Sequence, residues 1–349
     1  MKIHERYIDR CIQLAQNGRG RTFPNPMVGS VIVYNDRIIG EGWHRKAGEP
    51  HAEVNAVNAV KDKELLKKAT IYVSLEPCSH YGKTPPCSNL IIDSGIKKVV
   101  IGTVDPFSEV AGKGIKKLFD AGCEVIVGVR EEACRELNKR FFTFHTKKRP
   151  YIILKWAETR DGFLSPGNLD TTEREPVWIS NRYSKQLVHK WRSEEQAIMV
   201  GTTTAVVDNP KLNTRLWHGN HPVRVVLDRQ LRIPAESYIF DDSIKTLVFT
   251  EKDTSERDSE NVIFEKLNFN APLPKQVCEI LYKYEIQSVI IEGGRQTLES
   301  FLDEGYWDEA RVFTGNTEFG KGITAPSIAG TLISEEHIAS DLLKIYKND

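Results

Sequence analysis

Residues 75–87 read LEPCSHYGKTPPC, and this stretch joins an expected strand at 70–75 to an expected helix that begins at Cys87. Two cysteines, Cys78 and Cys87, flank eight residues that include a histidine, a lysine, a glycine and two prolines. Three arrangements would use two thiols held on such a loop: a disulfide, a structural metal site, or a metal site that performs chemistry. The rest of the sequence decides between them.

The length and composition of the chain favour two globular domains. Its 349 residues exceed the size of one ordinary hydrophobic core. The charged N-terminal segment MKIHERYIDR lacks the apolar stretch of a signal peptide, and no run approaches the ~18 apolar residues of a membrane span. We therefore expect a cytoplasmic protein without a membrane partner. Disulfides are rare in that compartment, so the six cysteines do not indicate a disulfide framework.

Charge is distributed unevenly between the two halves. Up to Lys147 the chain carries 23 Lys and Arg against 17 Asp and Glu, whereas the remainder carries 25 against 31. A basic first half suits a phosphorylated or nucleic-acid substrate, although such an excess is also common on a solvated surface.

Apolar runs bounded by turn residues alternate with amphipathic stretches, which predicts an α/β fold with a partly parallel sheet. In the first half we expect strands at 29–34, 70–75, 98–102 and 124–128, and helices at 4–16, 52–60, 87–94 and 113–120. The run FFTFHTKKRP at 141–150 interrupts this pattern, and a new strand, YIILKWA, begins at Tyr151. We place a domain boundary there and predict domains at 1–147 and 148–349.

The second half shows the same alternation and predicts a second α/β domain. We expect strands at 151–157, 197–201, 223–228, 246–249, 288–292 and 309–313, and helices at 182–193, 275–284 and 297–303.

A histidine and a glutamate open the helix expected at 52–60. Zinc accepts the mixture of one imidazole and two thiolates that His51, Cys78 and Cys87 offer. Three protein ligands leave a fourth tetrahedral position for water, which is the catalytic arrangement. Zinc lowers the pKa of water to about 7, and Glu53 is placed to move the proton to a ring nitrogen and help ammonia leave. The pattern predicts a zinc deaminase with Glu53 as its catalytic residue.

This pattern of residues can also be interpreted in other ways. Zinc deaminases carry H-x-E followed by P-C-x-x-C, and this chain matches except that its second cysteine follows eight residues after the first. A lone His-x-Glu is usually ordinary surface or core. A purely structural zinc site would leave Glu53 unused and lacks an evident fourth ligand. The remaining cysteines lie in apolar patterns and are predicted to be small core residues: Cys11, Cys123, Cys134 and Cys278.

Several motifs together resemble the bifunctional riboflavin-biosynthesis deaminase–reductase family: TFPNPMVGSVIV at 22–33, GEGWH at 40–44, GEPHAE at 48–53 and LEPCSHYGKTPPC. The resemblance implies a cytidine-deaminase-like α/β/α domain. Its substrate would be a diaminopyrimidinone that carries a ribosylamino 5′-phosphate. By position, Asn25 would hold the pyrimidine or ribose, and His44, His80 and Lys83 would line the substrate and phosphate pocket.

The segment SVIIEGGRQTLESFL at 288–302 predicts a buried strand, a glycine pair and a helix start. Such a turn exposes N–H groups to a phosphate, or the glycines only permit tight geometry. No G-x-G-x-x-G follows a strand, so a Rossmann domain is not indicated.

The reductase half of the same family resembles LKWAETRDG at 154–162, VWIS at 177–180, HKWRSE at 189–194 and AIMVGTTTAVVDNPKLNTR at 197–215. The resemblance implies a dihydrofolate-reductase-like α/β fold, NADPH, and hydride transfer to C1 of the ribose in its ring-opened imine form. It implies cofactor contacts by Ala157, Trp178, Thr204, Asp208, Gly294, Arg295, Gln296 and Thr297. It implies substrate contacts by Lys155, Arg192, Leu212, Arg215 and Glu292.

One position departs from the family. A serine commonly stands two residues before the tryptophan of the W-I pair, and this chain has Pro176 there. Proline cannot donate a side-chain hydrogen bond, so Pro176 cannot supply the side-chain contact that this serine offers, and its effect on substrate binding is left open.

Other functions remain open at the level of sequence. A zinc deaminase acting on a nucleic-acid base, with the second half as a binding module, would need a basic, aromatic-rich second half, and this one is acidic. A non-catalytic scaffold would leave the open zinc position unexplained. We therefore expect a small phosphorylated pyrimidine as partner and no nucleic acid, and we leave open whether the chain forms a homo-oligomer.

Overall fold

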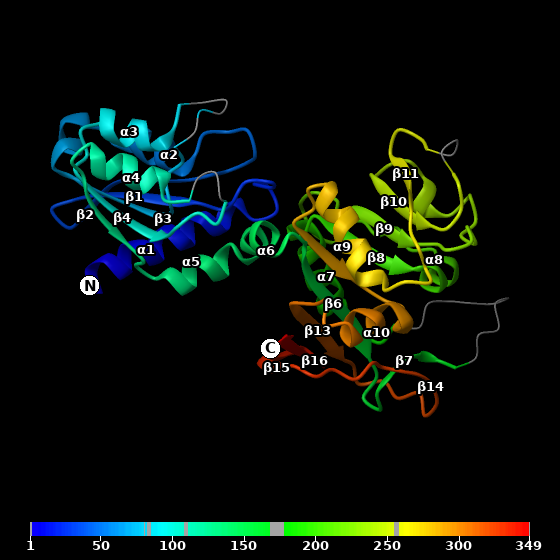
Figure 1. Ribbon diagram of the computed structural model, residues 1–349. Coiled ribbons are helices and arrows are strands. Elements are labelled where there is room, and N and C mark those ends of the chain that lie inside the picture. The colour runs from blue at the N-terminus through cyan, green and yellow to red at the C-terminus, as the bar shows by residue number, and fades with distance from the viewer. Residues whose placement is uncertain are drawn as a thin grey trace. The chain divides into compact units, whose positions relative to one another are not determined.

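The computed structural model describes residues 2–79, 81, 85–107, 111–167, 178–254 and 258–348. The chain divides into two compact units, Met1–Lys148 and Arg149–Asp349, each built around its own sheet (Figure 1). None of the helices in the described ranges is both long enough and apolar enough to cross a membrane.

Unit 1 (Met1–Lys148) contains a five-stranded sheet in the order β2-β1-β3-β4-β5. Its strands are β1 (Gly29–Tyr34), β2 (Arg37–Trp43), β3 (Thr70–Leu75), β4 (Lys98–Thr103) and β5 (Glu124–Val127). β1 pairs antiparallel with β2 and β3, whereas β3, β4 and β5 are parallel. The parallel strands end at one edge of the sheet, and the segment with the two cysteines starts there.

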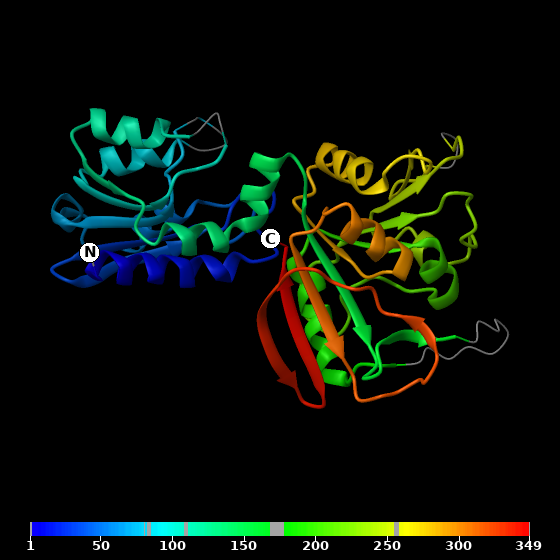
Figure 2. The same cartoon turned by 60° about the horizontal axis from the view of Figure 1, so that its bottom comes forward.

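Helices cover both faces of this sheet (Figure 1, Figure 2). On one face lie α1 (Lys2–Ala15) and α5 (Glu131–Leu137), and on the other lie α2 (Ala52–Ala59), α3 (Cys87–Asp93) and α4 (Lys113–Asp120). α1 buries Tyr7, Ile8, Cys11 and Leu14, a helical spacing that forms one apolar stripe. Two short 3₁₀ turns, η1 (Gln16–Gly18) and η2 (Lys63–Lys68), and the helix α6 (Lys139–Lys147) complete the unit.

Unit 2 (Arg149–Asp349) contains a nine-stranded sheet in the order β11-β10-β9-β8-β12-β6-β13-β16-β15. Its strands are β6 (Tyr151–Glu158), β8 (Ala197–Gly201), β9 (Val223–Leu227), β10 (Thr246–Thr250), β11 (Val262–Lys266), β12 (Ser288–Ile291), β13 (Glu309–Thr314), β15 (Thr331–Ile338) and β16 (Asp341–Lys347). All pair in parallel except β16, which is antiparallel to β13 and β15. β7 (Phe163–Pro166) and β14 (Gly322–Thr324) form a separate pair.

The helices of unit 2 also lie on both faces of its sheet. α9 (Leu273–Lys283) and α10 (Arg295–Asp303) pack on one face, and α7 (Arg182–Glu194) and α8 (Thr202–Asp208) pack on the other. A 3₁₀ turn, η3 (Tyr238–Phe240), lies near α8 in the same core. β12 inserts between β8 and β6 although it follows both in the chain. Such a reversal of strand order is where open α/β sheets usually bind ligands.

The α/β prediction is confirmed, and the structure adds elements that sequence patterns did not indicate. β2 was missed because RIIGEGW contains two glycines that weaken a strand pattern. The run at 141–150, read as a break, belongs largely to α6, which buries Phe141, Phe142 and Phe144. The C-terminal hairpin of β15 and β16 was also missed, because seven of the eight residues of β15 are exposed and show no alternation.

A buried ion pair joins the starts of two central strands in unit 2. Arg149 Nη1 and Nη2 donate to the Asp308 carboxylate at 2.6 and 2.8 Å, and the Ile152 N–H donates to it at 2.9 Å. Both charged side chains are almost fully buried. The carboxylate therefore ties β6 to β13 at the beginning of the sheet.

Replacing this carboxylate should destabilise unit 2. We expect Asp308→Ala to lower the free energy of unfolding by about 3–5 kcal/mol, because it leaves a buried guanidinium without its partner. Urea unfolding followed by tryptophan fluorescence measures the change. The exposed Arg160–Glu318 pair supplies the control, since Glu318→Ala should cost at most ~1 kcal/mol. Equal urea midpoints for the two variants would contradict this role for Asp308.

Candidate metal centre and cofactor site

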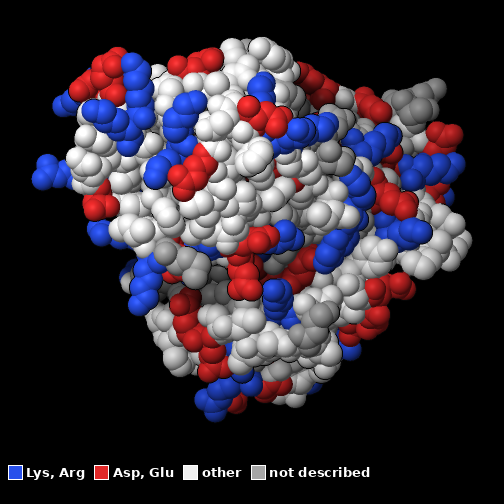
Figure 3. Space-filling view, turned by 60° about the vertical axis from the view of Figure 1, so that its left-hand side comes forward, with Lys and Arg blue, Asp and Glu red and all other residues white. Residues whose placement is uncertain are grey.

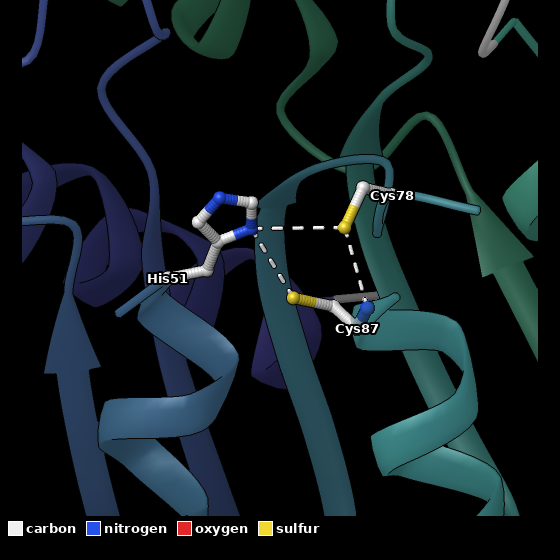
Figure 4. A group of neighbouring side chains, drawn as sticks. All are labelled: His51, Cys78 and Cys87. Atoms are coloured by element: carbon white, nitrogen blue, oxygen red, sulfur yellow. Dashed lines mark hydrogen bonds between the residues drawn. The ribbon is translucent and has the colours of Figure 1, made fainter. Parts of the chain in front are cut away.

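The candidate metal centre is built from two helix starts and one strand end (Figure 4). His51 stands just before α2, Cys78 follows β3, and Cys87 is the first residue of α3. His51 Nδ1 lies 3.6 Å from Cys78 Sγ and 3.3 Å from Cys87 Sγ. The three ligand atoms lie within 4.8 Å of one another, and the described part of the chain contains no second group of this kind.

These separations fit a zinc ion. Bonds of about 2.3 Å to sulfur and about 2.0 Å to nitrogen place tetrahedral ligand atoms roughly 3.5–3.8 Å apart. A hydrogen bond from Cys87, together with the neighbouring His51, lowers the pKa of Cys78 to about 4 in spite of burial. The same hydrogen bond and burial raise the pKa of the Cys87 thiol. These contacts favour the thiolate of Cys78 over its thiol, as a cation site requires.

Glu53 lies on the first turn of α2, two residues beyond His51, with only 3% of its surface exposed. Burial, and after it the charge of Cys78, raises the pKa of Glu53 to about 7. The neighbouring His51 and Cys87 partly offset this rise in pKa, so the carboxyl group lies close to the ligand residues. It therefore faces the three ligands and is not turned to solvent.

Two residues that were predicted to contact the substrate, Asn25 and His44, lie side by side next to this centre. The rings of His44 and His51 lie edge to face with centroids 5.4 Å apart. Asn25 Nδ2 lies 3.2 Å from His44 Nε2, and His44 Nδ1 lies 3.2 Å from the Pro50 carbonyl. These contacts suit a neutral imidazole with its proton on Nδ1, and burial lowers the pKa of His44 accordingly. Asn25 and His44 are thus brought to the centre.

The position of Cys78 depends on the buried carboxylate of Glu76, which sequence reasoning missed. Its Oε1 accepts from the N–H groups of Gly114 and Ile115 at 2.9 and 3.2 Å, and its Oε2 accepts from those of Asp105 and Gly112 at 3.3 and 3.0 Å. A methyl group at Gly114 would lie 2.0 Å from the Pro77 carbonyl, so only glycine permits this contact. Glu76 therefore ties the end of β3 to the start of α4.

Three predicted positions lie outside the described residues. They are His80 and Lys83, in the loop between the cysteines, and Pro176. The cysteines predicted to be core residues, Cys11, Cys123, Cys134 and Cys278, are all buried and free.

In unit 2 a carboxylate and two cations meet at the end of β12. Arg192 Nε and Nη2 donate to Glu292 Oε1 and Oε2 at 3.0 and 2.7 Å. Lys155 Nζ lies 3.9 Å from Glu292 Oε2. Burial would raise the pKa of Glu292, but the charges of Arg192 and Lys155 lower it to about 2. Burial lowers the pKa of Lys155.

The loop after α8 brings a third cation to this group. Leu212 is buried with a positive φ of 46°, and Arg215 follows three residues later. Arg215 Nη1 donates to Asn213 Oδ1 at 3.2 Å, and no acidic side chain among the described residues pairs with it. Burial and the charge of Arg192 lower the pKa of Arg215. Lys155 and Arg192 therefore flank one carboxylate, and the nearby Arg215 leaves the group with an excess of positive charge.

Two helix starts approach each other closely beside the glycine pair of unit 2. The Gly201 N–H donates to the Gly293 carbonyl at 2.9 Å. A methyl group at Gly201 would lie 2.6 Å from Thr297 Oγ1, and one at Gly294 would lie 3.1 Å from Thr204 Oγ1. No side chain caps the first turn of α10, which starts at Arg295. The glycines thus permit the close approach of two helix starts, and the uncapped start of α10 offers N–H groups of the kind that bind the phosphates of a dinucleotide.

The other predicted cofactor residues are placed less tightly. Ala157 is half-buried in the last part of β6. Trp178 is 60% exposed, and Lys185 Nζ lies 3.5 Å from the centroid of its ring. Asp208 is exposed at the end of α8, one helical turn from Thr204. Gln296 is exposed on the first turn of α10.

Some residues that hold the sites carried only weak sequence signals. Glu76 stands in the LEPC motif. Its position between the buried strand β3 and the metal ligand Cys78 was the one sequence feature that indicated a structural role. His189 stands three residues before Arg192, so the two share a helix face. Asn138 donates to and accepts from the Met27 backbone at 2.8 Å and holds the segment before β1, but no local pattern indicated this pairing.

Taken together, the fold and the site define a zinc-dependent deaminase domain followed by a second α/β domain. Comparison with known families agrees. The family described as the cytidine and deoxycytidylate deaminase zinc-binding region matches residues 1–103, and the RibD C-terminal domain matches residues 150–347.

Full-length relatives identify the family. The riboflavin biosynthesis protein RibD of Aquifex aeolicus is 39% identical and aligns over 99% of both chains. The Synechocystis protein of the same name is 40% identical over 93% of this chain and 88% of its own. The crystal structure of a diaminohydroxyphosphoribosylaminopyrimidine deaminase/5-amino-6-(5-phosphoribosylamino)uracil reductase from Thermotoga maritima is 37% identical, with a TM-score of 0.86 over 100% of this chain and 99% of that one. Acinetobacter baumannii RibD is 33% identical, with a TM-score of 0.90 over the same shares.

The chain belongs to the RibD family of riboflavin biosynthesis. It is a bifunctional enzyme, a zinc-dependent deaminase and an NADPH-dependent reductase, as the resemblance of its motifs implied.

Weakening the Glu76 anchor should loosen the metal centre. In Glu76→Gln one oxygen becomes an amide nitrogen that cannot accept from two buried N–H groups. We expect the free energy of unfolding of unit 1 to fall by about 1–3 kcal/mol and zinc affinity to fall by roughly 10–100-fold. Competition with a coloured zinc chelator measures the affinity. The exposed Glu124 offers the control, Glu124→Gln. Wild-type zinc affinity in Glu76→Gln would refute the anchoring role.

Proposed function

We propose that residues 1–147 remove the 2-amino group of 2,5-diamino-6-(5-phosphoribosylamino)pyrimidin-4-one, and that residues 148–349 then reduce its ribosyl chain to ribityl with NADPH. The observation that carries this proposal is the convergence of His51, Cys78 and Cys87 beside the buried carboxyl group of Glu53.

In the deaminase half, His51, Cys78 and Cys87 would hold the zinc ion. When bound there, zinc supplies a Lewis acid that activates water at neutral pH. Glu53 then accepts a proton from the water and delivers it to a ring nitrogen of the pyrimidine. The second proton of the water leaves with the amine as ammonia, and the ring carbon keeps the oxygen. Glu53 can perform this transfer because α2 holds it buried beside the ligands.

Substrate recognition in the same half is assigned to Asn25 and His44, whose polar groups lie beside His51. The neutral imidazole of His44 donates from Nδ1 to the backbone, so it holds its ring in place while Asn25 presents an amide to the pyrimidine or ribose. His80 and Lys83 are proposed to meet the substrate and its phosphate from the loop between the cysteines.

In the reductase half, the positive charge gathered by Lys155, Arg192 and Arg215 around Glu292 suits a phosphorylated substrate. Leu212 would contribute the apolar side of this pocket. Hydride would pass from NADPH to C1 of the ring-opened imine, and the imine nitrogen would take a proton.

The cofactor would bind at the glycine pair. The N–H groups at the start of α10, in Gly294, Arg295, Gln296 and Thr297, would hold its phosphates, and Ala157, Trp178, Thr204 and Asp208 would contact the remainder. The close approach of α8 and α10 over Gly201 and Gly294 supports this assignment.

Two features bear on the surroundings and partners of the enzyme. All six cysteines are free, which suits the reducing cytoplasm. The face shown in Figure 3 mixes Lys and Arg with Asp and Glu, whereas a nucleic-acid partner would call for a continuous basic surface. We therefore propose a small-molecule substrate in the cytoplasm.

The proposal is tested on the purified full chain. The wild type should release ammonia from the pyrimidine substrate and then consume NADPH. Cys87→Ala should lose bound zinc and ammonia release, because two ligands cannot hold the ion tightly, and it should still reduce substrate that is supplied already deaminated. Ammonia release without zinc, or NADPH consumption lost together with the metal, would count against the division of labour.

Glu53 can be tested separately from the metal. We expect Glu53→Gln to retain zinc and to lower the rate of deamination by at least ~10²-fold, because an amide cannot accept and return the proton. Zinc content and ammonia release are measured on the same sample. The exposed Glu64 supplies the control variant, Glu64→Gln, which should keep full activity. A Glu53→Gln enzyme with near-normal turnover would overturn the assignment.

A further inference from the structure

His189 is a buried histidine to which neither the family resemblance nor the proposed reaction assigns a role. It lies on α7 three residues before Arg192 and is 4% exposed. Its Nδ1 accepts a hydrogen bond from the backbone N–H of Arg215 at 3.2 Å. The contact joins a rigid helix to the loop that carries the one cation of the substrate site without an acidic partner in the described structure.

The ring is held in the form that this contact requires. Burial, with the charges of Arg192 and Arg215, lowers the pKa of His189 to about 4. The imidazole is therefore neutral near pH 7 and can keep Nδ1 free of a proton, so that it accepts from the Arg215 N–H. A protonated His189 would be repelled by Arg192 and Arg215, whereas the neutral ring can accept this hydrogen bond beside them.

Other hydrogen bonds hold the residues of the loop before Arg215, whereas the backbone of Arg215 itself is held by His189. Arg192 Nη1 donates to the Asn213 carbonyl at 3.3 Å, and the Thr214 N–H donates to His221 Nδ1 at 3.2 Å. Asn213 Oδ1 in turn accepts from Arg215 Nη1 at 3.2 Å. The backbone of Arg215 is anchored by His189, and its guanidinium is steadied from within the loop.

We propose that His189 is a positioning residue that holds Arg215 in place to bind the phosphate of the reductase substrate. This inference rests on the proposed function, which assigns Arg215 to the substrate. In this role His189 keeps Arg215 in its binding conformation before the substrate arrives. A guanidinium that must first be ordered binds a phosphate more weakly, because ordering it costs free energy. His189 itself touches neither substrate nor cofactor in this role, so it should affect substrate binding and leave hydride transfer unchanged.

Two polar variants distinguish positioning from ordinary core packing. In His189→Asn the amide oxygen can take the place of Nδ1 and accept from Arg215. In His189→Gln the amide lies one bond further out and leaves that N–H without an acceptor. Both variants remove the ring, so a loss of packing affects them alike. The exposed His218, in the same loop region, supplies the neutral control His218→Asn.

The experiment measures steady-state reduction of the deaminated substrate at saturating NADPH. We expect His189→Gln to raise KM for the phosphorylated substrate about tenfold, as the loss of one hydrogen bond predicts. Its kcat and its KM for NADPH should stay within about twofold of the wild type, and His189→Asn should recover most of the loss. In the background of Arg215→Ala the His189→Gln substitution should add little, because the two residues act as one unit.

Three results would overturn the inference: equal KM values for the Asn and Gln variants, a fall in kcat at unchanged KM, or effects of His189 and Arg215 that simply add. If the wild-type chain reduces its substrate and the variants behave in one of these ways, only the role of His189 fails. A wild-type chain that consumes no NADPH with this substrate would instead refute the proposed function.

Discussion

The buried carboxylate of Glu76 is the constraint on which the metal centre depends. The hydrogen bonds among the two cysteines and the imidazole are too few to gather them by themselves, so the backbone must bring them together. Four N–H groups converge on this one carboxylate and tie the end of β3 to the start of α4. Cys78 follows two residues later, so the anchoring of Glu76 also fixes where the backbone of Cys78 lies. Because the carboxylate is satisfied on both oxygens, its burial costs little.

Unit 2 uses charge in a different way. The negative charge of Glu292 is paired, because Arg192 donates two hydrogen bonds to its carboxylate and Lys155 lies nearby. A buried ion pair of this kind adds little net stability, but it holds long side chains in one conformation. The surplus cation, Arg215, then gains its position from a neutral histidine. The site therefore combines fixed charges with one guanidinium that remains available to an anion.

Sequence patterns predicted most of the central strands and the helices between them, because apolar runs of four to eight residues are a local signal. They predicted the zinc ligands and Glu53 for a similar reason: His51 and Glu53 are neighbours in the chain, and both cysteines stand at ends of predicted elements. They failed at β2, where glycines weaken the strand pattern, and at β15, which is exposed on both faces. They also misread α6, whose closely spaced phenylalanines and basic end hide the helical period.

The sequence by itself determined the fold class, the donor set of the candidate metal centre and the carboxyl group that accompanies it, since local apolar patterns indicate the first and short motifs of metal-binding residue types indicate the others. Only the tertiary structure decided which groups hold those residues in place. Glu76 reaches N–H groups 29 to 39 positions further along the chain, and His189 accepts from a backbone 26 positions away. Such contacts leave no periodic trace, because their partners become neighbours only when the sheet brings distant loops to the same edge.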